Sequence, residues 1–258
     1  MKDMECVPNL TNCVICGKRV ATTRDHVPPE GIFPKPLPSN SMKKSDRYKT
    51  AHLIEDQFEP GSNEQVLKNK LGITNPDEMD KREKEEQLRA MDELTDFFDR
   101  DHRFTADDIC KMHKMWLGNV YEWAGKYRQV KMSKGDFSFA FPEQIPKLMA
   151  ELEKGLLHEF TPCNFKSHDD IAKALAIVHT ELVLIHPFRE GNGRVARMLA
   201  ILMAIQAGLP PLDFSDMTGI GKKEYIKAIH AGMEINYEPM GRVFTSVLRK
   251  TLRAREPR

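Results

Sequence analysis

The sequence predicts an all-α fold of about eight helices, with one β-hairpin and an irregular N-terminal arm. Apolar residues recur at helical spacing through most of the chain after residue 47. Residues 126–141 break that period with short alternating runs on either side of Ser133-Lys134-Gly135-Asp136, which is typical of a hairpin. Residues 1–45 are rich in Pro, Asn, Ser and Lys and show no helical pattern. We therefore divide the chain into an arm, 1–45, and a helical domain, 46–258.

Capping residues place the first helices of this domain. Asn63 can cap a helix that reaches Leu71 and is ended by Gly72. Asn75, with a proline after it at the first helical position, begins a second helix. Thr105, followed by two aspartates in the first turn, begins a third.

The later helices are predicted in the same way. Ser167 begins a long apolar helix that runs through Ile185. A further helix follows Asn192 and is ended by Gly208 and the two prolines after it. Two last helices are expected over about 222–236 and 239–253.

Composition excludes several broad classes of protein. The chain is 40% hydrophobic and 30% charged, with a formal net charge of +1, so no overall field draws it onto nucleic acid or a membrane. No apolar run approaches membrane-spanning length. The five cysteines do not form a disulfide framework, and this usage suits a reducing compartment. We expect a cytoplasmic protein with no membrane partner.

Residues 186–197, His-Pro-Phe-Arg-Glu-Gly-Asn-Gly-Arg-Val-Ala-Arg, hold the densest set of chemically useful side chains, between two apolar helices. Gly191 and Gly193 let a bulky anion approach the backbone N–H groups, and the helix that begins near Asn192 directs its positive end to the same place. Arg194 and Arg197 lie one helical turn apart, so both guanidinium groups can reach one phosphate chain. This pattern predicts a phosphate-binding loop.

The same loop carries groups for catalysis. Glu190 is its only carboxylate, and a single carboxylate together with phosphates commonly holds Mg²⁺. His186 has an ordinary pKa of about 6.5, which suits it to accept a proton from a hydroxyl group. A histidine before a proline is, by itself, more simply a helix-ending turn, and two arginines can be a solvated helix face. The rest of that helix is apolar, however, so burying both arginines without a ligand would be costly.

The loop resembles the Fic family signature, H-x-F-x-[D/E]-G-N-G-R-x-x-R, at every fixed position. Three flanking segments also resemble the family: residues 60–73, its opening helix; Trp123-Ala124-Gly125-Lys126, the start of its flap hairpin; and Tyr237-Glu238-Pro239-Met240, the boundary of its C-terminal helix. The resemblance covers about residues 50–250. It implies the Fic fold and a protein adenylyltransferase, which moves AMP from ATP to a Ser, Thr or Tyr hydroxyl and releases pyrophosphate.

The resemblance also implies roles for single residues. His186 would deprotonate the target hydroxyl, Glu190 would hold Mg²⁺, and a target segment would add a strand to the flap at Lys131–Phe139. The residues implied to bind the nucleotide are Gly191, Asn192, Gly193, Arg194, Arg197 and Tyr225. From spacing alone, Tyr225 is an ordinary aromatic of an amphipathic helix. The alternating phenylalanines of the hairpin fit either an exposed docking surface or a half-buried strand.

Many members of the family are inhibited by a glutamate in an [S/T]-x-x-x-E-[G/N] helix, which pairs with the second signature arginine, here Arg197. The nearest segment in this chain is Ala51-His-Leu-Ile-Glu55-Asp56, which departs from the pattern at its first and last positions. One hypothesis makes Glu55 an intramolecular brake. The other is that a separate small antitoxin supplies the glutamate.

The arm carries a second resemblance, to the beginning of an HNH nuclease module. It rests on Cys13-Val-Ile-Cys16 and on Asp25-His26. The next cysteine is Cys110, so the second Cys-x-x-Cys pair of such modules is missing. We expect an incomplete module without nuclease activity. The alternative is an arm that binds zinc with the help of Cys6 and His26.

Two other functions stay open at this stage. The same fold can transfer UMP, phosphate or phosphocholine, although the intact Gly-Asn-Gly-Arg segment favours AMP. A metal-binding or nucleic-acid-binding protein led by the arm is the other alternative, against which the near-neutral charge and the incomplete cysteine set count.

Overall fold

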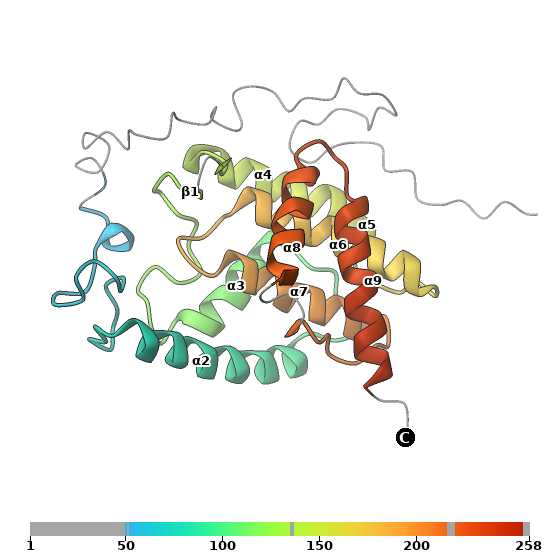
Figure 1. Ribbon diagram of the computed structural model, residues 1–258, viewed down its shortest axis with the longest axis horizontal. Coiled ribbons are helices and arrows are strands. Elements are labelled where there is room, and N and C mark those ends of the chain that lie inside the picture. The colour runs from blue at the N-terminus through green and yellow to red at the C-terminus, as the bar shows by residue number, and fades with distance from the viewer. Residues whose placement is uncertain (1–49, 51, 135–136, 216–219, 255–258) are drawn as a thin grey trace, which may run out of the picture.

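The computed structural model describes residues 50, 52–134, 137–215 and 220–254. Within these ranges the chain is mostly helical and has one two-stranded antiparallel sheet, as the sequence predicted (Figure 1). The arm, with its cysteines and its Asp-His pair, lies outside the described residues, and so does the boundary at residue 45.

Two helices whose beginnings were predicted from their caps form one layer. Helix α2 spans Pro76–Phe97, and the Asn75 side chain accepts hydrogen bonds from the first two backbone N–H groups after the proline. Helix α3 spans Ala106–Leu117 and begins in a capping box formed by Thr105 and Asp108. The two helices pack against each other.

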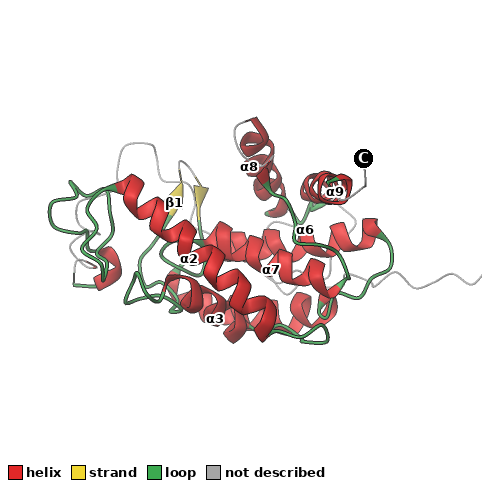
Figure 2. Ribbon diagram, turned by 90° about the horizontal axis from the view of Figure 1, so that it is seen from below, coloured by secondary structure: helices red, strands yellow, loops and turns green. Residues whose placement is uncertain are grey.

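The centre of the fold is α6, His168–Ile185, which is buried on all sides from Ala174 to its end. It packs against α7, Asn192–Gln206, and against α8, Ile220–Gly232, and α9, Glu238–Arg253. Figure 2 shows α6 and α7 between α3 on one side and α8 and α9 on the other. The loop between α6 and α7 is therefore anchored at both ends in the core.

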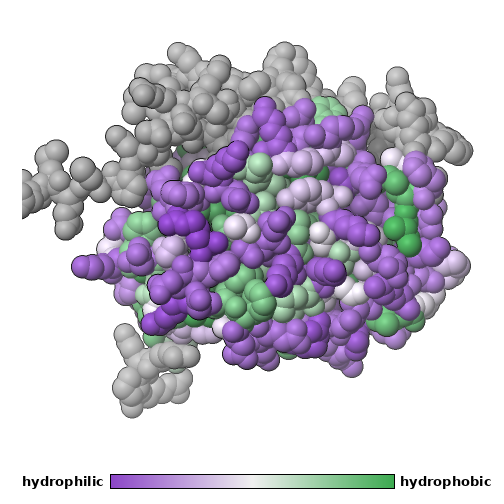
Figure 3. All heavy atoms as spheres, turned by 180° about the vertical axis from the view of Figure 1, so that it is seen from behind, coloured by the Kyte–Doolittle hydropathy of each residue, from purple (hydrophilic) through white to green (hydrophobic). Residues whose placement is uncertain are grey.

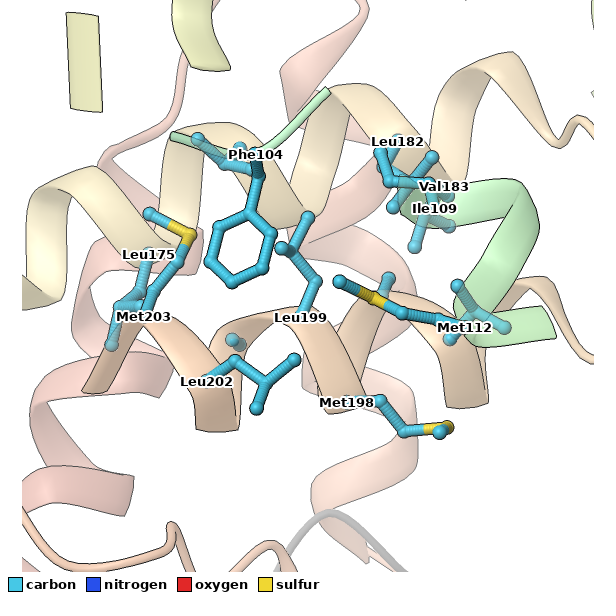
Figure 4. Packing of buried hydrophobic residues seen from close by; sticks show 14 of the residues in the cluster. Phe104, Ile109, Met112, Leu175, Leu182, Val183, Met198, Leu199, Leu202 and Met203 are labelled. Carbon is cyan, nitrogen blue, oxygen red and sulfur yellow. The ribbon is translucent and has the colours of Figure 1, made fainter. Parts of the chain in front are cut away.

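Side chains of α3, α6 and α7 interlock in this core. Figure 4 shows Met112 of α3 directed at the α7 side chains, with Phe104 filling the space beside Leu199. The buried α7 residues in this view are Met198, Leu199, Leu202 and Met203. Close packing of this kind fixes the direction in which α7 leaves the loop.

Residues 142–160 form helices that the sequence analysis did not assign. A 3₁₀ turn, Pro142–Gln144, leads into α4, Ile145–Leu152. The chain continues through a π-helical turn, Glu153–Leu157, into the short α5, His158–Phe160.

The helix predicted from Asn63 to Leu71 is wrong. Asn63 and Glu64 have φ angles of 53° and 58°, and the segment folds into turns with one bridge between Phe58 and Leu67. The Asn69 side chain accepts from the N–H groups of Leu71 and Ile73 and donates to two carbonyl groups. These side-chain bonds satisfy the backbone locally and replace those of a helix.

The predicted hairpin is present as β1, Ser133–Lys134, and β2, Phe137–Ser138, with Ser133 opposite Ser138. Its aromatic side chains turn inward: Phe139 is buried, and Phe137 is half-buried and stacks on His230. The alternation of the phenylalanines thus follows a half-buried strand, not an exposed aromatic surface.

Polar side chains cover most of the face drawn in Figure 3, with hydrophobic ones scattered among them. Among the described helices, none is long and apolar enough to cross a membrane.

Candidate active site

A cavity of about 360 Å³ opens between the hairpin and the loop that joins α6 to α7. The hairpin side lines it with Met132, Ser133, Lys134 and Phe139. The loop and α7 line it with His186, Arg189, Glu190, Gly191, Asn192, Gly193, Arg194 and Arg197. A second hollow of about 410 Å³, between Phe165 and Gly208, contains no residue of this loop. The fold thus brings the signature loop and the hairpin together at one cavity.

His186 ends α6 in the left-handed conformation, with φ 53°. Its Nδ1 atom lies 3.1 Å from the carbonyl oxygen of Val183. A carbonyl oxygen only accepts, so Nδ1 carries the proton and Nε2 keeps a lone pair. Burial lowers the pKa of His186 to about 3, and the positive charges of Arg128 and Lys134 act in the same direction. The imidazole is therefore neutral, and its Nε2 is a hydrogen-bond acceptor.

Gly191 caps α7 with φ 83°, and a Cβ atom at this position would lie 2.5 Å from the Trp116 ring. Only glycine fits both constraints. A Cβ atom on Gly193 would meet only the Arg197 guanidinium, at 3.7 Å. The N–H group of Arg194 donates to the carbonyl oxygen of Gly191, whereas those of Asn192 and Gly193 precede any acceptor in the helix, so these two make this end of α7 suited to an anion.

The Asn192 side chain holds the loop in its shape. Its buried side chain accepts from the N–H group of Phe188 and donates to the carbonyl oxygen of Phe188, both at 2.8 Å. These two bonds close the loop into a fixed turn. The Asn192 amide thus holds the loop; the residue also lines the cavity, and its contact with a phosphate stays a prediction.

The two signature arginines lie in contrasting surroundings. Arg194 forms an ion pair with Glu83 at 2.6 Å, lies 3.4 Å from Glu190 and covers the Trp116 ring at 4.6 Å. Arg197 is half-buried, and burial is the main cause that lowers its pKa. Within the described ranges no carboxylate pairs with Arg197. A cation in such a place is suited to an anionic ligand in the cavity.

Glu190 stands at the mouth of the cavity with its side chain 46% exposed. One of its oxygens accepts from the N–H group of Gly191 at 2.8 Å. In the described part of the chain, no group of three or more His, Cys, Asp or Glu residues is placed to hold a metal. A metal at Glu190 would therefore take most of its ligands from a bound substrate and water.

His113 of α3 is a supporting residue whose contacts the sequence did not predict. It is fully buried, and its ring stacks on Phe188 at 4.0 Å. Its Nδ1 accepts from the N–H group of Gly125, so its Nε2 donates to the carbonyl oxygen of Glu190 at 3.1 Å. This buried histidine therefore supports the signature loop from the side of α3.

Tyr225 of α8 lies outside the cavity lining. Its hydroxyl shares a hydrogen bond of 2.9 Å with Nε2 of the buried His179, and burial raises the pKa of the phenol to about 12. A contact between Tyr225 and adenine stays a prediction.

Glu55 does not contact Arg197. It lies in a 3₁₀ turn, Ile54–Asp56, where its buried carboxylate accepts from the N–H group of Gln129 at 2.6 Å. Its carbonyl oxygen accepts from Arg189 at 2.9 Å. Burial raises the pKa of Glu55, while the Gln129 hydrogen bond and Arg189 oppose this effect. Glu55 thus fastens this turn to the base of the hairpin and to the signature loop, and an inhibitory role for it stays a prediction.

Comparison with known proteins gives one family. The sequence model of the Fic/DOC family matches residues 103–204. A protein adenylyltransferase, fic-1, from Caenorhabditis briggsae is 37% identical over 130 residues, which cover 50% of this chain and 24% of that protein. The shared segment is thus about a quarter of that relative. A probable protein adenylyltransferase, y4lH, from Sinorhizobium fredii is 31% identical over 153 residues, covering 58% of this chain and 74% of that protein.

Solved structures agree in fold. The BepC protein of Bartonella tribocorum with bound AMPPNP superposes with a TM-score of 0.61 and 27% identity, covering 76% of this chain and 97% of that one. The N-terminal Fic domain of a Bep effector protein from Bartonella quintana, with bound ADP, superposes with a TM-score of 0.61 and 28% identity. The match covers 76% of this chain and 95% of that one. The signature loop, the hairpin beside it and the sequence similarity together show that the chain belongs to the Fic/DOC family.

Proposed function

We propose that this protein transfers AMP from ATP to a Ser, Thr or Tyr hydroxyl of a protein and releases pyrophosphate. The observation that carries the proposal is that a candidate base, His186, and a candidate phosphate-binding cation, Arg197, line the same cavity. His186 has a lone pair at Nε2, and Arg197 has no carboxylate partner among the described residues. One is suited to take a proton from a hydroxyl, and the other is suited to hold a phosphate.

ATP as the donor is supported by the relatives. The structurally similar Bartonella proteins hold AMPPNP and ADP, and the curated relatives carry the name protein adenylyltransferase. In this chain, Arg197 and the first-turn N–H groups of α7 would hold the outer phosphates, with Arg194 beside them.

The reaction then follows from the positions of these groups. The target hydroxyl gives its proton to Nε2 of His186, and its oxygen forms a bond with the α-phosphorus. The bond from the α-phosphorus to the bridging oxygen breaks, and pyrophosphate leaves with that oxygen. Negative charge that builds up on the phosphate oxygens is stabilised by the α7 N–H groups and the arginines.

Mg²⁺ fits the donor set at Glu190. The half-exposed carboxylate faces the cavity, and a divalent cation there would complete its shell with phosphate oxygens and water. When bound, such an ion supplies charge neutralisation on the phosphates.

The target would dock on the hairpin, at Lys131–Phe139. The Ser133 and Lys134 side chains are exposed, whereas Phe139 packs inward. Recognition would therefore rest on backbone hydrogen bonds to an added strand more than on aromatic side chains of the hairpin.

Inhibition of the transfer activity would come from a group outside the described residues. Glu55 is held by Gln129, and Arg197 keeps its guanidinium free of carboxylates in the described ranges. A small antitoxin that offers a glutamate to Arg197 fits this arrangement. The cytoplasmic location inferred from the free cysteines belongs to the same proposal.

Intact mass spectrometry tests the function. The protein is incubated with Mg-ATP and host lysate beside His186→Ala and a matched control, His158→Ala, whose histidine is exposed and outside the cavity. AMP adducts in wild type and His158→Ala, and none in His186→Ala, are expected. Adducts that form only with UTP or CDP-choline would replace AMP by another group. Adducts that persist in His186→Ala would remove the base from the proposal.

A further inference from the structure

Arg128 is a fully buried arginine that joins the hairpin to the signature loop. It is 1% exposed. Its three guanidinium nitrogens donate to the carbonyl oxygens of His186, Val130 and Ala140, each at 2.7 Å. Its own backbone N–H donates to the carbonyl oxygen of Pro187 at 2.8 Å. One side chain thus fastens both sides of the hairpin base to the residue at the end of α6.

Burying this cation is expensive. Its guanidinium bonds only to backbone carbonyls, and no carboxylate within the described ranges accepts a hydrogen bond from it. Burial lowers the pKa of Arg128 to about 10, opposed by the negative charge of Glu55, whose carboxylate bonds the next residue along. An apolar side chain would fill the space at lower cost. The planar three-point geometry of the guanidinium is therefore what this position requires.

The hydrogen bonds of the Arg128 guanidinium help to fix the orientation of the His186 imidazole. His186 has a φ angle of 53°, a backbone conformation that residues other than glycine rarely adopt. Arg128 fixes the direction of the His186 carbonyl group. The ring is stacked on Phe139 of the hairpin at 3.6 Å. The imidazole is consequently held from the backbone side by Arg128 and from the ring side by the hairpin that Arg128 also holds.

We propose that Arg128 is a positioning residue for the transfer reaction, which sets the orientation of the His186 imidazole relative to the hairpin and hence to a hydroxyl docked there. The proposal rests on the proposed function. A merely structural arginine would change the free energy of unfolding and leave the transfer rate of the folded protein unchanged. A positioning arginine changes the transfer rate without changing nucleotide affinity, because Arg197 and the α7 N–H groups do not depend on it.

The test uses Arg128→Lys and Arg128→Ala in the full chain, beside Arg89→Ala. Arg89 also donates to a backbone carbonyl, that of Met115, and to carboxylates of α2, but it lies outside the cavity. Each variant is measured for thermal unfolding, for ATP dissociation constant and for the single-turnover rate of AMP transfer.

We expect Arg128→Lys to bind ATP with the wild-type dissociation constant and to transfer AMP roughly ten- to a hundredfold more slowly. Millimolar guanidinium ion should restore part of the rate to Arg128→Ala and leave Arg89→Ala unchanged. A wild-type rate in folded Arg128→Lys would overturn the proposal, and so would parallel losses of rate and ATP affinity.

A readout independent of activity separates this inference from the proposed function. The readout is the proton NMR signal of the His186 Nδ1–H group, which is assigned by its loss in His186→Ala. This signal should broaden or shift in Arg128→Lys and stay unchanged in Arg89→Ala. If wild type transfers no AMP but this signal responds as expected, the function is wrong and the positioning role stands. An unchanged signal in Arg128→Lys would overturn the positioning role whatever the activity.

Discussion

Arg194 of α7 and Glu83 of α2 form an ion pair of 2.6 Å that connects the first signature arginine to the opposite layer of the fold. Glu83 is buried and also accepts a hydrogen bond of 2.7 Å from the Tyr121 hydroxyl. The Trp116 ring under Arg194 donates its indole N–H to the carbonyl oxygen of Glu83. The direction of Arg194 is therefore set by α2 and α3 before any ligand arrives.

Replacing Glu83 by Gln should weaken both stability and ATP binding. The amide oxygen still accepts from Tyr121, but the charge that orients Arg194 is gone. We expect the free energy of unfolding to fall by roughly 1–3 kcal/mol, measured by denaturant unfolding. Glu85→Gln, at an exposed carboxylate 3.8 Å from Arg82, is the control and should change little. Tighter ATP binding by Glu83→Gln would mean that Glu83 competes with phosphate for Arg194.

Alanine at Gly191 and at Gly193 should have different effects on stability. Gly191→Ala places Cβ against the buried Trp116 ring at a φ of 83°, so the free energy of unfolding should fall by at least about 1–2 kcal/mol. Gly193→Ala lies in the first turn of α7 with room for Cβ, so it should keep or raise stability while ATP affinity falls. Thermal unfolding and nucleotide titration check both. Equal stability of the two variants would contradict the assigned role of Gly191.

Replacing Glu55 should loosen the base of the hairpin without activating the protein. Glu55→Ala leaves the N–H group of Gln129 without its acceptor, which costs roughly 1–3 kcal/mol. Glu55→Gln keeps an acceptor oxygen and is the matched control. Automodification with Mg-ATP should not exceed the wild-type level in either variant. A clear rise in Glu55→Ala alone would support the hypothesis that Glu55 inhibits the protein.

Stability should fall as the pH rises from about 5 to 8 because of one buried carboxyl group. Glu181 of α6 is fully buried, accepts from the Tyr237 hydroxyl at 2.7 Å, and has its pKa raised by burial to about 7. The protonated form is favoured in the folded state, so its contribution is complete below the unfolded pKa of about 4.5 and is lost as the pH passes 7.

Glu181→Gln removes this titration. The variant should be more stable than wild type at pH 8, by on the order of 1–3 kcal/mol, and the difference should shrink toward pH 5. Denaturant unfolding at several pH values measures it. A difference between the two proteins that does not change with pH would show that Glu181 does not titrate in this range.

The failed helix at 63–71 shows where capping residues alone were insufficient. Asn63 can cap a helix and Gly72 can end one, but the Asn69 amide satisfies the neighbouring backbone groups and removes the advantage of helical bonds. By contrast, the caps at Asn75, Thr105 and Ser167 placed helix starts correctly, because a cap bonds to groups two or three residues away.

What the sequence determined by itself is local. The signature loop, the helix beginning at Asn192 and the hairpin are each encoded within a dozen or so residues, so their patterns could be interpreted without a fold. Tertiary structure decided which residues support them. Arg128 meets His186 across 58 positions, and His113 meets Glu190 across 77. Such partners are chosen by the packing of helices and carry no sequence spacing of their own, because a buried donor bonds whichever carbonyl group the fold brings within reach.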